Sequence, residues 1–432
     1  MITYKIVITT ILATLIFLTA CGVNNDDDPE ITPDEPHQIA DEERLQGDEI
    51  AYDLSLDQRD EDDLSLEQRI DNYIETYDQN IRGLSISIFT KDDMILEIEH
   101  GYADEEAELA IDSDAVFEWG ALTKQLVWIS VMQLYEREEL DLHADIFTYI
   151  SESDFPKIIY PTTMFHLMNH SAGFDDYVNI EFRDMIVGMD DDAAPTLEAL
   201  LMDVIASEYA TQGWQPGERV RFSIFGTILA SYIVQQVSGV PFYEYVHSYV
   251  FAPLGMYQTA LRPDMSDNQW VREQREEIKV YDMWGLQFFQ RRQMLAYPTG
   301  AAVGTISDMV KFARALMPDE NGGSVLFEHA ETLSMLHPSH EDIQNAPICE
   351  VIPMNVTFFN GVGFFPDSSR DSESAGVIGH FGATSGFRVF WFIDIDRGVG
   401  MIMGENTSHG LAGLDGFFGF FTHEIPELAL GI

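Results

Sequence analysis

The chain has 432 residues, with 23 lysine and arginine residues against 74 aspartate and glutamate residues, and a formal net charge of −51. This charge excludes most nucleic-acid-binding functions, because every phosphate would repel the protein. The hydrophobic content of 46% is that of a folded globular protein with a sizeable core. Two cysteines are too few for a disulfide-stapled small fold or a cysteine-rich zinc site.

The amino terminus has the features of an export signal. Lys5 precedes an apolar run, residues 6–19, that is shorter than the roughly 20 residues a membrane-spanning helix needs. The run ends in Leu18-Thr-Ala-Cys-Gly22, which resembles the lipobox of bacterial lipoprotein signal peptides. The resemblance implies that residues 1–20 are removed and that Cys21 is lipidated, which anchors the protein to the cell membrane on its extracytoplasmic face. A plain secretory signal with a chance cysteine is the alternative, and both predict export.

Residues 21–64 are predicted to be an acidic, disordered tether. From Asp26 to Arg69 there are 18 acidic and 3 basic side chains, a net charge of −15 that leaves −36 for the rest of the chain. Few large apolar side chains interrupt this stretch, so it cannot bury enough surface to fold. A coil of about 43 residues spans roughly 35–40 Å, which would hold the folded domain away from the membrane.

The folded domain is expected to occupy residues 65–432 and to open with a helix followed by two antiparallel strands. Ser65 and Gln68 form a capping-box pattern. Apolar residues at helical spacing follow, namely Ile70, Tyr73, Ile74, Tyr77 and Ile81. Residues 84–89 alternate as a half-buried strand, 91–93 indicate a turn, and 94–102 form a second strand. A helix followed by antiparallel strands indicates an α+β fold.

The first chemical motif lies in Phe117-Glu-Trp-Gly-Ala-Leu-Thr-Lys124, ahead of a long apolar helix. It resembles the Ser-x-x-Lys motif of the serine β-lactamase and penicillin-binding-protein superfamily, in the branch of class C β-lactamases, esterases and D-aminopeptidases. Residues three apart share a helix face, so the lysine amine can lie beside the serine hydroxyl and help to deprotonate it. Here Lys124 is present, but Ala121 occupies the nucleophile position, and a methyl group cannot attack a carbonyl.

The resemblance extends through most of the domain, over residues 162–174, 215–226, 237–239, 253–256 and 297–308. It implies a β-lactamase/transpeptidase-like α+β fold: an antiparallel sheet flanked by helices, with a mostly helical subdomain inserted at about residues 122–295. It implies no cofactor. His166 and His170 have a spacing that metal ligands use, but no third ligand accompanies them, so no metal site is expected.

The second and third motifs differ in how well they are preserved. Where the family has Tyr-x-Asn, this chain has Phe222-Ser-Ile224, so the tyrosine hydroxyl and the asparagine amide are both absent. Gly379-His-Phe-Gly-Ala-Thr384 resembles the His-x-Gly variant of the Lys-Thr-Gly strand. By this resemblance His380, Gly382 and Ala383 would contact a ligand, and the backbone N–H groups of Ala121 and Ala383 would form an oxyanion hole.

These departures favour a catalytically inactive relative that binds a cell-wall peptide or another small carbonyl ligand in its cleft, or a protein partner. Lys124 would then bind a ligand carboxylate or be paired with an acid of the protein. One alternative is an active hydrolase with a relocated nucleophile at Thr123, Ser130 or Ser223. A second alternative is an architectural envelope protein that uses its surface.

The acidic surface predicts that salt stabilises the fold. Raising NaCl from about 0.1 M to about 1 M shortens the Debye length from about 10 Å to about 3 Å and screens the repulsion. We therefore expect the melting temperature to rise by several degrees in a thermal melt, with sucrose of equal osmolality as the control. A melting temperature that stays constant or falls with NaCl would contradict this prediction.

Overall fold

The computed structural model describes residues 64–77, 81–176, 187–189, 194–207, 210–282, 286–287, 292–337, 357–359, 362–364, 377–407 and 429. The chain divides into two units, residues 1–69 and 70–432. The following description concerns the second unit, apart from the first turn of helix α3. The predicted signal peptide, Cys21 and nearly all of the predicted tether lie outside the described residues.

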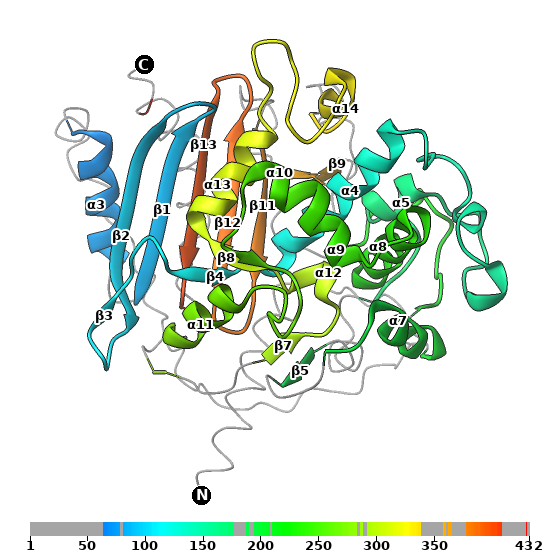
Figure 1. Cartoon of the computed structure of the whole chain (residues 1–432), viewed down its shortest axis with the longest axis horizontal. Helices are drawn as coiled ribbons and strands as arrows, with labels where there is room; N and C mark the ends of the chain where they lie inside the picture. The colour runs from blue at the N-terminus through cyan, green and yellow to red at the C-terminus, as the bar shows by residue number, and fades with distance from the viewer. Residues whose placement is uncertain are drawn as a thin grey trace, which may run out of the picture. The chain divides into compact units, whose positions relative to one another are not determined.

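A six-stranded antiparallel sheet joins the two ends of the domain. Its order is β11-β12-β13-β1-β2-β3. The strands are β1 (Gly83–Thr90), β2 (Met94–Asp104), β3 (Leu109–Ala110), β11 (Val377–Ala383), β12 (Arg388–Asp394) and β13 (Val399–Glu405). Strand β1 lies between β2 and β13, with Ile86 opposite Met403, so blue and orange-red strands lie side by side in Figure 1. The predicted antiparallel sheet and the hairpin at residues 84–102 are confirmed.

Helix α3 (Leu66–Tyr77) precedes the sheet and begins at the predicted capping box. The backbone N–H of Ser65 donates to the Gln68 side chain (2.9 Å), and the Gln68 N–H donates to the Ser65 hydroxyl (3.2 Å). Ile70 and Ile74 of the predicted apolar stripe are buried. The local pattern therefore predicted both the start and the buried face of this helix.

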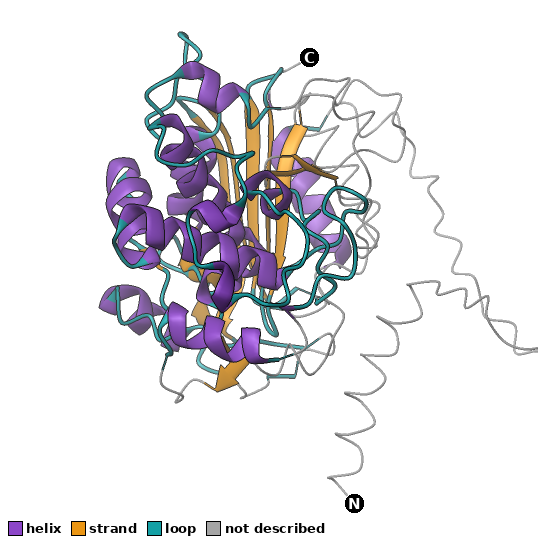
Figure 2. Cartoon of the chain, turned by 90° about the vertical axis from the view of Figure 1, so that its right-hand side faces the viewer, coloured by secondary structure: helices purple, strands orange, loops and turns teal. Residues whose placement is uncertain are grey.

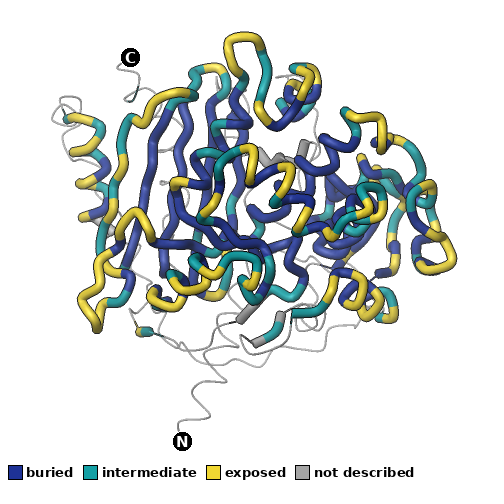
Figure 3. Tube along the Cα trace, in the orientation of Figure 1, coloured by how far each residue is buried: buried dark blue, intermediate teal, exposed yellow. Residues whose placement is uncertain are grey.

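The centre of the sheet is buried on both faces. Every residue of β13 is buried, as are the first seven residues of β1, whereas β2 mixes exposed and partly buried positions (Figure 3). Figure 2 shows the sheet close to edge-on, with most of the helices gathered on one side of it. The functional motifs lie on this helix-covered side, because Trp391 of β12 donates from its indole N–H to Gln125 of helix α4 at 2.8 Å.

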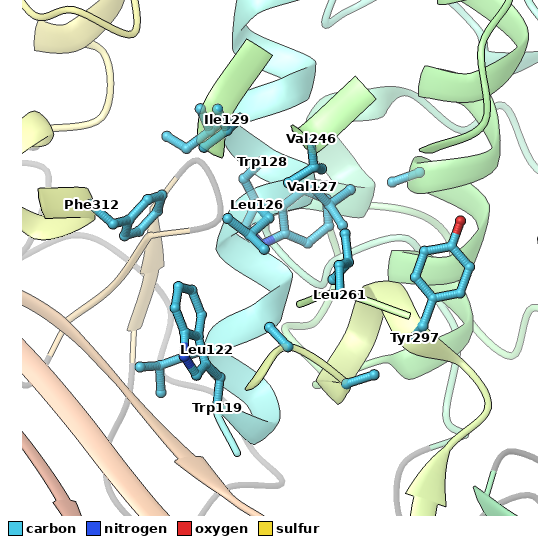
Figure 4. Packing of buried hydrophobic residues seen from close by; sticks show 14 of the residues in the cluster. Trp119, Leu122, Leu126, Val127, Trp128, Ile129, Val246, Leu261, Tyr297 and Phe312 are labelled. Atoms are coloured by element: carbon cyan, nitrogen blue, oxygen red, sulfur yellow. The ribbon is translucent and has the colours of Figure 1, made fainter. Parts of the chain in front are cut away.

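A mostly helical subdomain is inserted between strands β4 (Val116–Glu118) and β8 (Val303–Thr305), as predicted. Its longest helices are α4 (Lys124–Glu136) and α8 (Ile224–Ser238), and both are largely buried. In Figure 4, Leu126, Val127 and Trp128 of α4 pack near Val246. The remaining elements of the insertion are η2 (Gly120–Thr123), η3 (Ile146–Thr148), η4 (Glu152–Asp154), α5 (Met164–Met168), β5 (Val187–Met189), α7 (Leu197–Ala206), α9 (Phe242–Val246), η6 (His247–Phe251), α10 (Ala252–Leu254), β6 (Thr259–Ala260), α11 (Gln269–Glu277), β7 (Arg292–Met294) and α12 (Tyr297–Gly300).

Three smaller sheets and two further helices complete the described elements. Strands β4, β8 and β6 form one small sheet, β5 pairs with β7, and β9 (Thr357–Phe359) pairs with β10 (Val362–Phe364). Helices α13 (Ile306–Ala315) and α14 (Ala330–Ser334) follow β8. In the described part of the chain, every helix is too short or too polar to cross a membrane.

Candidate functional site

The first and third motif segments touch through their backbones. A Cβ atom on Gly382 would lie 1.8 Å from the carbonyl oxygen of Trp119, and one on Gly120 would lie 2.6 Å from the amide nitrogen of Ala383. Gly120 also has a φ of +52°, in the left-handed region. Only glycine fits both positions, and the pair brings η2, with Ala121, against the end of β11.

The amide of Ala383 points out of the sheet. The Thr384 N–H donates to the Phe387 carbonyl (3.0 Å), so these two residues are a hydrogen-bonded pair of the β11–β12 hairpin. Such pairs alternate along an antiparallel ladder, so Ala383, opposite Arg388, directs its N–H and C=O away from β12. Among the described strands, β11 lies at the edge of its sheet. Ala383 is exposed and Ala121 is half-buried, so the described residues leave this end of β11 open to a ligand.

Lys124 is buried at the start of α4, with a relative exposure of 3%. Its Nζ donates to the carbonyl of Thr299 (2.7 Å) and lies 4.6 Å from the centroid of the Phe222 ring. Burial lowers the pKa of Lys124 to about 7, and the charge of Asp176 offsets only part of this effect. Within the described residues no ion pair joins Lys124 to an acid, so the pairing that the sequence left open is not found there.

The Phe222 ring packs on a buried histidine. The Phe222 and His170 rings are close to stacked at 4.6 Å, and Trp128 meets His170 edge-on at 6.0 Å. The Ser223 N–H donates to His170 Nδ1 (3.1 Å), so the neutral ring has its proton on Nε2. Burial and the nearby Lys124 charge lower the pKa of His170 well below its usual range, so the ring is neutral. Phe222 therefore has an aromatic packing role at a position that lacks a hydroxyl.

Asp176 caps the amino terminus of α8 directly behind the second motif. Its carboxylate accepts from the N–H groups of Ile224 (2.7 Å) and Phe225 (3.0 Å) and from the Ser223 hydroxyl (2.6 Å). The same hydroxyl accepts from the Gly226 N–H (2.8 Å), as an N-cap does. Burial raises the pKa of Asp176, although these hydrogen bonds act in the opposite direction. The Ile224 side chain is buried and has no polar atom to offer a ligand.

The three hydroxyls that a relocated nucleophile could use are all buried and hydrogen-bonded within the protein. Thr123 accepts from the Ala302 N–H (3.1 Å), and Ser130 donates to the Leu126 carbonyl (2.7 Å). Ser223 is held by the helix cap described above. Each of these groups therefore has a structural role that attack on a substrate would disrupt.

His380 completes a cluster of three basic side chains with Lys124 and His170, called the basic cluster below. Its Nδ1 lies 2.7 Å from the carbonyl of Phe381, so Nδ1 carries the proton of the neutral ring. Burial, with a smaller contribution from the Lys124 charge, lowers the pKa of His380 to about 4. Both histidines are thus neutral at pH 7, and Lys124 is the titrating member of the cluster.

His166, considered above as a metal ligand with His170, has a local role. Its Nδ1 accepts from the Thr163 N–H (3.2 Å) in the capping box of α5. Across the part of the chain that the structure describes, no group of three potential metal-ligating side chains gathers.

Sequence reasoning missed several residues that support the site. Thr299, Asp176 and the aromatic role of His170 are examples, because their partners lie far away in the sequence. Another is Arg275, which donates from Nε and Nη2 to Glu118 (2.9 and 2.6 Å). Its guanidinium also lies 4.6 Å from the ring of Phe387, in the hairpin that follows β11. A basic residue in an acidic chain was the only sequence signal for Arg275, and neither its burial nor its partner was predictable.

A separate cavity of about 470 Å³ lies in the helical subdomain, among α7, α8 and α9. None of the motif residues lines it. Its lining includes Tyr297, the first residue of α12, and Thr299 of the same helix holds Lys124. The cavity is therefore distinct from the motif site but shares one supporting helix, α12, with it.

The beta-lactamase family profile matches residues 66–416, most of the chain. The chain belongs to the beta-lactamase family. Penicillin-binding protein 4 of Amycolatopsis lactamdurans is 23% identical over 362 residues, covering 81% of this chain and 86% of that protein. Penicillin-binding protein 4* of Bacillus subtilis is 22% identical over 167 residues, only 39% of this chain and 35% of that protein.

Solved structures show the same fold. D-amino acid amidase from Ochrobactrum anthropi superposes with a TM-score of 0.63 at 20% identity, covering 85% of this chain and 98% of that chain. The family and fold predicted from the motifs are thus confirmed. At 20% identity this likeness shows the fold alone. The chemistry has to be argued from the residues of the site.

The buried amine makes stability depend on pH. The pKa of Lys124 is about 7 in the folded chain and 10.5 for a free lysine, so between these pH values the unfolded chain binds more protons and stability rises with pH. Lys124→Met removes the cost of burying the amine. We expect the variant to gain up to about 5 kcal/mol below pH 7, at about 1.4 kcal/mol per pKa unit, less about 1 kcal/mol for the lost hydrogen bond.

The gain should shrink as pH rises from 7 towards 10.5, in urea unfolding at several pH values. Lys279→Met, at a partly exposed lysine, is the matched control for losing one positive charge. An equal difference between wild type and Lys124→Met at every pH would refute the buried-amine account.

Proposed function

We propose that the protein is a membrane-anchored, catalytically inactive relative of serine hydrolases, which binds a cell-wall peptide or related carbonyl ligand without cleaving it. The observation that carries this proposal is Ala121 at the nucleophile position beside a retained Lys124. Removing a catalytic serine from a hydrolase costs about 10⁶ in rate. The buried, hydrogen-bonded Thr123, Ser130 and Ser223 support this reading over a relocated nucleophile.

The site keeps groups suited to binding. The outward N–H of Ala383 offers a hydrogen bond to a ligand carbonyl, and that of Ala121 lies on the adjoining segment. Lys124 offers a positive charge to a carboxylate when it is protonated. The names of the penicillin-binding relatives support a cell-wall peptide as the ligand class. A protein partner and an architectural role are the competing uses of the same fold.

The anchoring half of the proposal rests on the amino-terminal sequence. The segment Leu18-Thr-Ala-Cys-Gly22 supports lipidation at Cys21, and the acidic stretch after it supports a tether. Together they would display the domain on the extracytoplasmic face of the cell membrane, where cell-wall peptides are found.

Exposure to covalent inhibitors tests whether the site lacks a hydroxyl nucleophile. Residues 22–432, incubated with a penicillin and separately with a fluorophosphonate, should keep an unmodified intact mass, because Thr123, Ser130 and Ser223 are buried and the described residues place no exposed hydroxyl beside Lys124. Ala121→Ser restores that hydroxyl and should become labelled by the fluorophosphonate, which shows that the reagent reaches the site. A stoichiometric adduct mapped to a serine or threonine of the unaltered chain would sink the proposal.

Calorimetry with a peptide ending in D-alanyl-D-alanine tests the binding function. A bound carboxylate raises the pKa of Lys124, so binding at pH 8 should take up a proton, and affinity should weaken by up to about tenfold per unit above pH 7. His170, His380 and Asp176 face the same amine, and the lowered pKa values of both histidines keep them neutral over this range.

The matched controls are the peptide with an amidated carboxyl terminus and the variant Lys124→Met. Both should bind more weakly, with no loss of affinity between pH 7 and pH 8. Absence of binding, or affinity independent of pH for the free-acid peptide, would contradict a role for Lys124 in holding a carboxylate.

A further inference from the structure

Lys124 has the surroundings of a reactive amine. One N–H donates to the Thr299 carbonyl, and the Phe222 ring lies against the amine. A neutral amine in this position has a lone pair that the Thr299 bond does not use. Desolvation without an acid partner favours the neutral form, which is the nucleophilic one.

The other described lysines either lie near a carboxylate or, like Lys124, donate to backbone carbonyls but are more exposed. Lys311 pairs with Asp308 (2.7 Å), and Lys279 lies near Asp104 (3.8 Å). Lys91 donates to the carbonyls of Arg314 and Met317, and Lys157 donates to that of Ser207; all four are more exposed than Lys124. The chain has only six lysines, so the reactivity of each can be followed individually.

Ala121 is the more exposed neighbour of Lys124, and the inference takes it as the point of ligand entry. Residues three apart lie on the same helix face, and Ala121 is half-buried whereas Lys124 is buried behind it. The methyl group of Ala121 leaves the space that a serine hydroxyl would occupy. The neighbouring side chains of Phe222 and Ile224 are apolar, which suits the alkyl group of a small aldehyde.

We propose that Lys124 is a nucleophilic amine that forms an imine with small apolar aldehydes at this site. The inference rests on the proposed function, because it requires a ligand-accessible site without a serine nucleophile. The Lys124 nitrogen forms a bond to the aldehyde carbon as the C=O π bond opens, and one of its two protons passes to the oxygen, giving a carbinolamine. The nitrogen then loses a proton, the C–O bond breaks, and the oxygen leaves as water, so one amine and one aldehyde give one imine and one water.

Reductive trapping tests this activity. The mature chain is incubated with propionaldehyde and cyanoborohydride at pH 7.5, and intact mass and peptide mapping identify the modified lysines. We expect one reduced adduct on Lys124, formed about tenfold faster than on any other lysine. A free lysine with a pKa near 10.4 is almost wholly protonated at this pH, whereas Lys124 is largely neutral.

Three controls separate this result from general lysine modification. In urea the preference for Lys124 should vanish, Lys124→Met should lose the fast adduct, and Lys279→Arg should keep it. The trapping rate at Lys124 should level off above pH 7 while the rates at other lysines keep rising. Equal modification of all lysines, or modification that leaves Lys124 last in the folded chain, would overturn the inference.

The test is independent of the inhibitor experiment. The fluorophosphonate reports on hydroxyl nucleophiles and the aldehyde reports on the amine. If no hydroxyl is labelled and no imine forms on Lys124, this inference is wrong and the proposed binding function stands. If a hydroxyl is labelled, the proposed function itself is wrong.

Discussion

The site depends on a backbone contact that only two glycines permit. Gly382 lies against the carbonyl of Trp119, and Gly120 lies against the amide of Ala383, at separations where any Cβ atom would clash. This contact fixes η2 to the edge of the sheet. Because α4 continues directly from η2, the same contact sets where Lys124 begins and which face its side chain occupies. The placement of Lys124 thus depends on two glycines, which have no side chains.

The ionisable side chains near this contact are mostly basic, whereas the chain as a whole is strongly acidic. The chain has a net charge of −51, yet Lys124, His170 and His380 gather in the interior. Three positive charges could not be buried together, so the two histidines are neutral and the pKa of Lys124 falls to about 7. Asp176 is the nearby acid, but its carboxylate is occupied by the start of α8. The amine is therefore left close to its titration point at neutral pH.

Sequence reasoning succeeded where the pattern was local. The Ser65 cap and the helix that follows Lys124 each depend on a few neighbouring residues, and both formed as expected. The strand at residues 84–89 also formed, but the prediction that it is half-buried was wrong, because the sheet is covered on both faces there and all six residues are buried. The placement of β1 beside β13 was not predicted, since no local pattern specifies strand order. The bond from Lys124 to Thr299 spans 175 positions, and a backbone carbonyl as acceptor has no sequence signature.

Phe222 bears on both the absent proton relay and the surroundings of the Lys124 amine. In the family that this chain resembles, a tyrosine here would supply a hydroxyl near the lysine to relay protons. Phe222 retains the ring that stacks on His170, so the packing of the cluster survives without the hydroxyl. The ring has no hydroxyl to offer Lys124, and its aromatic centroid lies 4.6 Å from Nζ. A buried amine without a polar side chain beside it is harder to protonate, so the phenyl ring at this position is consistent with both proposals, the absent proton relay and the nucleophilic Lys124.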